Sequence, residues 1–109
     1  MTSREPASFA TFTTGRFREG HRDGAIAVFR DLIELDHHEP GTLVQAFHLD
    51  RDDPNVFRVY ELWASEDALE VHRRNGSQLR TRLAPLVVGD FEVHVCDPLV
   101  AKGVPQASL

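Results

Sequence analysis

Apolar and polar side chains alternate along four short stretches of the chain, which is the pattern of β-strands whose successive side chains point to opposite faces. The clearest stretch is 55–63, and the others are 8–17, 42–50 and 91–96. Both faces of 55–63 carry apolar residues, so we expect both to be covered. One of these faces carries four residues: Phe57, Val59, Glu61 and Trp63.

Two other segments repeat apolar residues at steps of three and four, which predicts amphipathic helices. The first begins at Ala25 or slightly earlier and ends at 37–38, because the Glu-Pro-Gly segment that follows cannot continue a helix. The second begins after Ser65, whose hydroxyl can accept a hydrogen bond from a backbone N–H of the first turn. It is interrupted near 75–77 and then resumes. His72 lies on the stripe of this helix that should face the sheet.

The predicted order of elements is strand, helix, strand, strand, helix, strand. This order predicts an α+β, ferredoxin-like βαββαβ fold, with one antiparallel sheet and both helices on one face. We expect a single domain at 8–97, a polar leader at 1–7 and a C-terminal tail at 98–109. Because the sheet face without helices also carries apolar residues, we expect a second copy to cover it, giving a homodimer with two sheets packed face to face.

Composition excludes several classes of protein. The 109-residue chain has a formal net charge of −5 and only one lysine, Lys102, which disfavours a nucleic-acid partner. No apolar run approaches the ~20 residues of a membrane span, and the N-terminus lacks the apolar core of a signal peptide. We therefore expect no membrane partner and a cytoplasmic protein. The single cysteine, Cys96, cannot form an internal disulfide.

Six histidines raise the question of a metal site. His37 and His38 are adjacent and point apart on a helix, His21 is at the other end of that helix, and His48 and His94 are on different strands. No close-spaced set of ligands results, so we predict no metal.

Several short motifs occur together in the middle of the chain. They are Glu39-Pro40-Gly41 before the second strand, Asp53-Pro54-Asn55 in the following turn, and Glu61-Leu62-Trp63 at the end of the third strand, followed by Ser65 and Ala68 and by His72 on the helix. With this order of elements, residues 8–97 resemble the antibiotic biosynthesis monooxygenase domain, a family of dimeric α+β barrels that includes small quinol monooxygenases.

The resemblance implies oxygenation of an electron-rich aromatic hydroxyl compound, such as a quinol or anthrone, by molecular oxygen and without flavin, haem or metal. Haem-degrading proteins of this fold carry a histidine late in the second helix, and 78–84 contains none. Such chemistry needs a base, a site for the resulting anion and a dry apolar cavity. We assign catalysis to His72 and Glu61. Substrate binding is assigned to Trp63, Phe57, Asn55 and Arg82.

Two other functions fit the same sequence. A ligand-binding protein without catalysis would have the same fold, because fold alone does not fix function. An isomerase or cyclase would use the same base without oxygen. Each candidate residue also has a purely structural interpretation: Trp63 as core, Glu61 as an ion-pair partner, His72 as a residue bonded to backbone, and Asn55 as a turn residue. Arg82 could be a surface ion-pair residue.

Overall fold

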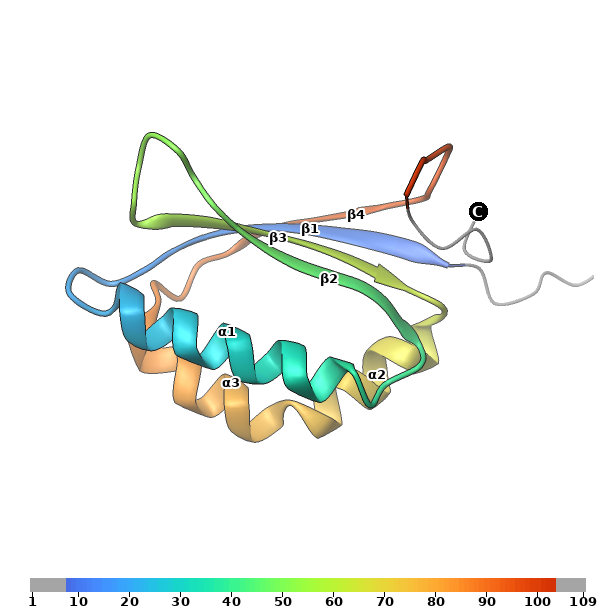
Figure 1. Ribbon diagram of the computed structural model, residues 1–109, viewed down its shortest axis with the longest axis horizontal. Coiled ribbons are helices and arrows are strands. Elements are labelled where there is room, and N and C mark those ends of the chain that lie inside the picture. The colour runs from blue at the N-terminus through green and yellow to red at the C-terminus, as the bar shows by residue number, and fades with distance from the viewer. Residues whose placement is uncertain (1–7, 104–109) are drawn as a thin grey trace, which may run out of the picture.

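A computed structural model of the chain describes residues 8–103, in which all helices lie under one face of a four-stranded antiparallel sheet (Figure 1). The strand order is β2-β3-β1-β4, so the predicted ferredoxin-like α+β fold is confirmed. The strands are β1 (Phe9–Arg16), β2 (Thr42–Leu49), β3 (Val56–Trp63) and β4 (Glu92–Cys96). The helices are α1 (Arg22–Asp36), α2 (Glu66–Asn75) and α3 (Ser77–Leu83), followed by the 3-10 turn η1 (Ala84–Leu86).

The helix boundaries follow the expected local chemistry with small differences. Helix α1 begins at Arg22, in agreement with the expected start at Ala25 or slightly earlier, and ends at Asp36, just before the expected end at 37–38. Ser65 caps α2 by accepting a hydrogen bond from the backbone N–H of Ala68 at 3.2 Å, as its position predicted. Gly76 separates α2 from α3, at the predicted interruption. The predicted leader at 1–7 lies outside the described residues, and so does the tail beyond residue 103.

Aromatic rings form the core between β1, β3 and α1. Phe57 on β3 is buried and lies 4.8 Å from Phe17 and 5.1 Å from Phe29, measured between ring centroids. A Cβ atom at Gly15 of β1 would lie only 2.4 Å from Phe57 Cζ. Glycine therefore occupies this position within a strand because the ring of Phe57 lies against its backbone.

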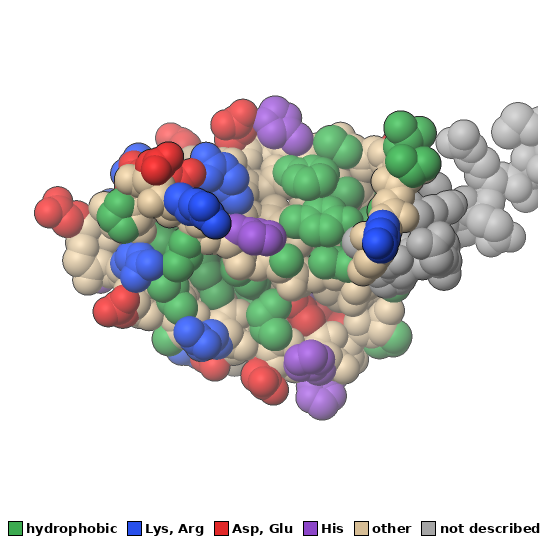
Figure 2. Space-filling view, turned by 45° about the horizontal axis from the view of Figure 1, so that its top comes forward, with side chains coloured by type: hydrophobic (Ala, Val, Ile, Leu, Met, Phe, Trp, Pro, Cys, Tyr) green, Lys and Arg blue, Asp and Glu red, His purple; other side chains and the backbone are tan. Residues whose placement is uncertain are grey.

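The sheet face opposite the helices is apolar at its centre. Figure 2 looks obliquely onto this face and shows hydrophobic side chains gathered there, with charged side chains around them. Phe12 of β1 is 46% exposed and stacks on Tyr60 of β3, with ring centroids 5.1 Å apart. Residues 97–101 line a pocket on this face together with Phe12 and Tyr60. In the described part of the chain, no helix has the length and apolar character needed to cross a membrane.

Candidate functional site

A pocket of about 180 Å³ lies between the sheet and the helices, where the sequence led us to expect the site. Its ionisable lining residues are Glu61 from β3, His72 from α2 and Arg80 from α3. The other lining residues are mostly apolar and include four phenylalanines: Phe29, Phe47, Phe57 and Phe91. Such a pocket, apolar except for a few convergent charged groups, is typical of small-molecule sites.

Glu61 is held by two side-chain donors from the neighbouring strands. Thr11 donates from Oγ1 to Oε1 at 3.0 Å, and Gln45 donates from Nε2 to Oε2 at 2.6 Å. Burial raises the pKa of Glu61 above its usual range, although these two hydrogen bonds act in the opposite direction. A carboxyl group with a raised pKa in a pocket is suited to proton transfer near neutral pH.

His72 is buried on the inner side of α2, where its ring lies 4.9 Å from the Trp63 ring between centroids. Its Nδ1 atom is 2.8 Å from Glu39 Oε1 and 3.1 Å from Asp36 Oδ1. Burial alone would lower the pKa of His72, but the hydrogen bonds and charges of these two carboxylates outweigh it, so the pKa is raised. The predicted orientation of His72 toward the strand that carries Trp63 is therefore observed.

Arg80 lines the pocket and forms no salt bridge with a described residue, although the charges of Glu39 and Glu61 act on it. Its pKa is lowered by burial and by the nearby charge of Arg73. Gly76 makes room for its guanidinium, because a Cβ atom at that position would lie 2.9 Å from Arg80 Nη1. A partly buried guanidinium with unused N–H donors can bind an anionic oxygen of a ligand.

Of the six residues assigned from the sequence, Glu61, His72 and Phe57 line this pocket. Trp63 lies behind it, almost fully buried, and donates from Nε1 to Thr11 Oγ1 at 3.2 Å. Asn55 is in the turn that precedes β3, at the opposite end of the strand from Trp63. Arg82 faces solvent and pairs with Asp31 at 3.1 Å. The structure thus brings together three of the six and places Trp63, Asn55 and Arg82 outside the pocket.

Among the lining residues that were not assigned from the sequence, Arg80 and Gln45 offer polar groups for binding or catalysis. Arg80 follows His72 by eight residues, but Gly76 separates α2 from α3 between them, so helical spacing alone did not identify Arg80. Gln45 lies opposite Glu61 in the pairing of β2 with β3. Its Oε1 atom is buried without a hydrogen-bond partner among the described residues, which leaves one free acceptor beside the pocket.

Three residues have ligand atoms that could hold a metal ion: Asp36, Glu39 and His72 lie within 4.8 Å of one another by these atoms. Histidine spacing in the sequence gave no sign of this group, because two of its members are carboxylates. The Glu39 oxygens already accept from Thr42 Oγ1 at 3.1 Å and from Asn75 Nδ2 at 3.0 Å, besides their contact with His72. These bonds favour a hydrogen-bonded charge cluster over a metal site.

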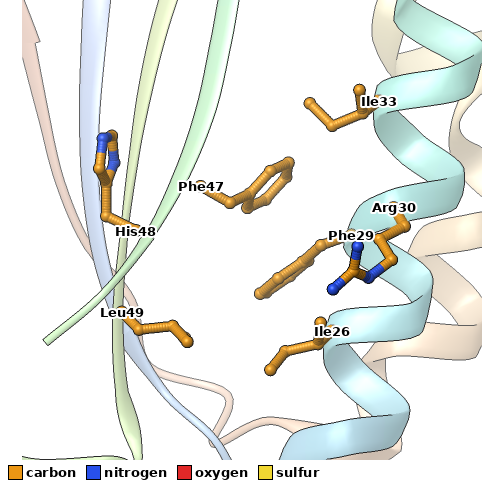
Figure 3. Close-up of a pocket in the computed structure, with 7 residues that line it drawn as sticks. All are labelled: Ile26, Phe29, Arg30, Ile33, Phe47, His48 and Leu49. Carbon is orange, nitrogen blue, oxygen red and sulfur yellow. The ribbon is translucent and has the colours of Figure 1, made fainter.

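A second pocket, of about 280 Å³, opens between β2 and α1 (Figure 3). Figure 3 shows Phe47 reaching from the strand toward the helix, with Arg30 and Ile33 on the helical side. Phe29 and Phe47 line both pockets, and their rings are stacked with centroids 4.3 Å apart. This stacked pair therefore forms the partition between the two pockets.

Comparison with known proteins gives a consistent picture of the fold. A candidate antibiotic biosynthesis monooxygenase from Caulobacter crescentus superposes with a TM-score of 0.80 at 23% identity, covering 87% of this chain and 92% of that chain. A second, from Nitrosomonas europaea, gives a TM-score of 0.80 at 16% identity over 94% of this chain and 100% of that chain. A third, from Chloroflexus aurantiacus, gives a TM-score of 0.79 at 20% identity, covering 91% of this chain and 100% of that chain. No curated protein matches the sequence.

Identities this low establish the fold alone, so the family rests on the sequence model. The model of the antibiotic biosynthesis monooxygenase family matches residues 9–82, which run from β1 into α3. This range includes Glu61, His72 and Arg80, the three ionisable residues of the pocket. The chain belongs to the antibiotic biosynthesis monooxygenase family.

Proposed function

We propose that the protein is a cofactor-independent monooxygenase that oxidises an electron-rich aromatic hydroxyl compound, a quinol, an anthrone or a related polyphenol, with molecular oxygen. The observation that supports this most directly is the meeting of Glu61, His72 and Arg80 in one pocket with phenylalanine walls. The walls suit a flat aromatic ring, and the three ionisable groups suit the removal of a proton and the binding of the anion that remains.

The reaction places definite demands on these groups. An ionised phenol gives electrons to oxygen more readily than a neutral one, so the hydroxyl proton must first be accepted, and Glu61 and His72 are the candidate acceptors. Arg80 has free donors for the resulting oxyanion. Oxidation of a ring CH₂ group, as in an anthrone, then consumes one O₂: one oxygen atom becomes the new carbonyl and the other leaves as water with the two hydrogens.

Oxygen consumption tests the proposal. Purified protein is mixed with a panel of quinols and anthrones, and uptake is compared with the uncatalysed rate at the same pH. We expect catalysed uptake with at least one compound and its strong reduction in Glu61→Gln, while Glu34→Gln, an exposed acidic residue on α1, keeps the wild-type rate. Ligand binding without catalysed uptake across the panel would instead identify a binding protein, and isomerisation without uptake would identify an isomerase or cyclase.

We also propose that the protein is a homodimer formed through the sheet face opposite the helices. The exposed ring of Phe12, stacked on Tyr60, lies in the apolar centre of that face. Replacing Phe12 with Asp places a charge in the proposed interface and should shift the dimer toward monomer in analytical ultracentrifugation. A wild-type mass near 12.3 kDa at working concentration would contradict the proposal.

A further inference from the structure

Behind the pocket, the end of α1 and the loop after it hold two buried carboxylates that the proposed reaction does not use directly. Asp36 is the last residue of α1, and Glu39 follows it in the loop. The side chains of Asp36, Glu39 and His72 are 9%, 3% and 7% exposed, respectively. Burying two carboxylates costs free energy unless a cation or hydrogen-bond donors compensate for it.

The two carboxylates are compensated differently. Glu39 accepts from Thr42, Asn75 and His72, and these bonds outweigh the effect of burial, so its pKa is lowered. Neither carboxylate oxygen of Asp36 has a hydrogen bond of good geometry among the described residues. Its Oδ1 atom lies 3.1 Å from His72 Nδ1, and burial raises its pKa. Nδ1 of His72 is therefore the one nitrogen that both carboxylates approach among the described residues.

This arrangement decides which ring nitrogen of His72 can face a substrate. Nδ1 lies against Glu39 and Asp36, so it is occupied on the side away from the pocket. Nε2 is the nitrogen to which no described side chain bonds, and the residue lines the pocket. The other ionisable groups that line the pocket are Glu61 on β3, which interacts favourably with a charged His72 ring, and Arg80 on α3, which is a second cation.

We propose that Asp36 and Glu39 are positioning residues that hold His72 as an imidazolium, with Nδ1–H donated to Glu39, the Asp36 carboxylate beside it as a second charge, and Nε2–H directed into the pocket. This inference rests on the proposed function. It divides the roles within the pocket: Glu61 accepts the proton of the substrate hydroxyl, and His72 with Arg80 donates hydrogen bonds to the phenolate that forms. His72 is then an anion-binding group and not the base.

The test observes the ring of His72 directly. The full chain is labelled with ¹⁵N, and long-range ¹H–¹⁵N spectra follow its two ring nitrogens against pH, with His72→Gln used for assignment. We expect His72 to titrate above its ordinary value of 6.5. In Asp36→Asn and Glu39→Gln the midpoint should move to lower pH, by about one unit or more when both are changed. Glu92→Gln, which removes the carboxylate beside exposed His94, should leave the His72 curve unchanged.

Each outcome of this test has one meaning. A wild-type His72 that is neutral at pH 6.5, or a midpoint that does not move in either variant, overturns the inference. Glu39→Gln could unfold the protein because Glu39 also accepts from Thr42 and Asn75, and in that event Asp36→Asn decides alone. In an active enzyme, the alkaline limb of kcat/KM should move with the midpoint. If the His72 midpoint moves in the variants but the protein oxidises no substrate, Asp36 and Glu39 do position His72 and the proposed monooxygenase function is wrong.

Discussion

The space between the sheet and the helices has two unlike halves. One half contains Phe17, Phe29 and Phe57, whose rings contact one another and fill their volume with apolar atoms. The other half contains His72 and Glu39, which are equally buried but charged. The aromatic half stabilises the fold by burial alone, whereas the charged half needs matched partners to be tolerated at all. This contrast indicates that the first half supports the site and the second half carries its chemistry.

Replacing Phe57 with Ala should cause the largest loss of stability, about 3–5 kcal/mol, because it opens a cavity among rings that pack around a nearly fully buried side chain. Urea denaturation measures this loss in the free energy of unfolding. Leu49→Ala is the matched control: Leu49 is 45% exposed and should cost less than about 1 kcal/mol. Similar losses in the two variants would show that the aromatic half is not the centre of the core.

The charged half should make stability depend on pH in a direction set by His72. Its pKa is raised in the folded protein, so its contribution is complete below the unfolded value of about 6.5 and is lost as pH rises through the folded value. The free energy of unfolding should therefore fall on going from pH 6.5 upward, by an amount on the order of 1 kcal/mol.

Denaturation at a series of pH values measures this slope in wild type and in His72→Gln, where it should disappear. Burial raises the pKa of Asp36 as well, so its contribution also falls with rising pH, starting from the unfolded value of about 3.8. Thr81→Ala changes the exposed surface without altering an ionisable group and should keep the wild-type slope. An equal slope in His72→Gln would mean that another group causes it.

The smallest effect is expected at Arg82, outside both halves. Its pair with Asp31 is about half exposed at both ends, so Arg82→Ala should cost less than about 1 kcal/mol and leave oxygen uptake within about twofold. Arg80→Ala, the matched change inside the pocket, should weaken substrate binding. A strong loss of activity in Arg82→Ala but not in Arg80→Ala would show that Arg82 belongs to the functional site.

Local patterns in the sequence predicted most of the fold, because alternation, helical spacing and the Ser65 cap are properties of neighbouring residues. They predicted the place of His72 and Glu61 for the same reason. Gly15 in β1 could not be explained in this way, since its requirement comes from Phe57 on another strand. The sequence also did not show that Arg80, and not Arg82, lines the pocket. Gly76 separates α2 from α3, so the face of α2 that carries His72 cannot be followed into α3 by counting residues.

The charge cluster behind His72 was missed for a related reason. Asp36 lies on the same helical stripe as the apolar residues of α1. An acidic residue on such a stripe indicates a buried carboxylate that needs a partner, and this was the one sign of the cluster in the sequence. Its partners come from the following loop and from α2, more than thirty residues later in the chain in the case of His72. Convergence of this kind depends on tertiary structure, so the search for closely spaced histidines could not detect it.

The most direct test of the central claim compares oxygen uptake by wild type and His72→Ala with the quinol or anthrone that reacts fastest. We expect a fall of about 10²–10⁴-fold in the catalysed rate, because a group of the reaction centre is removed, measured at a temperature at which far-UV circular dichroism shows both proteins folded. A catalysed rate in His72→Ala equal to that of wild type would contradict the claim that the charged half carries the chemistry.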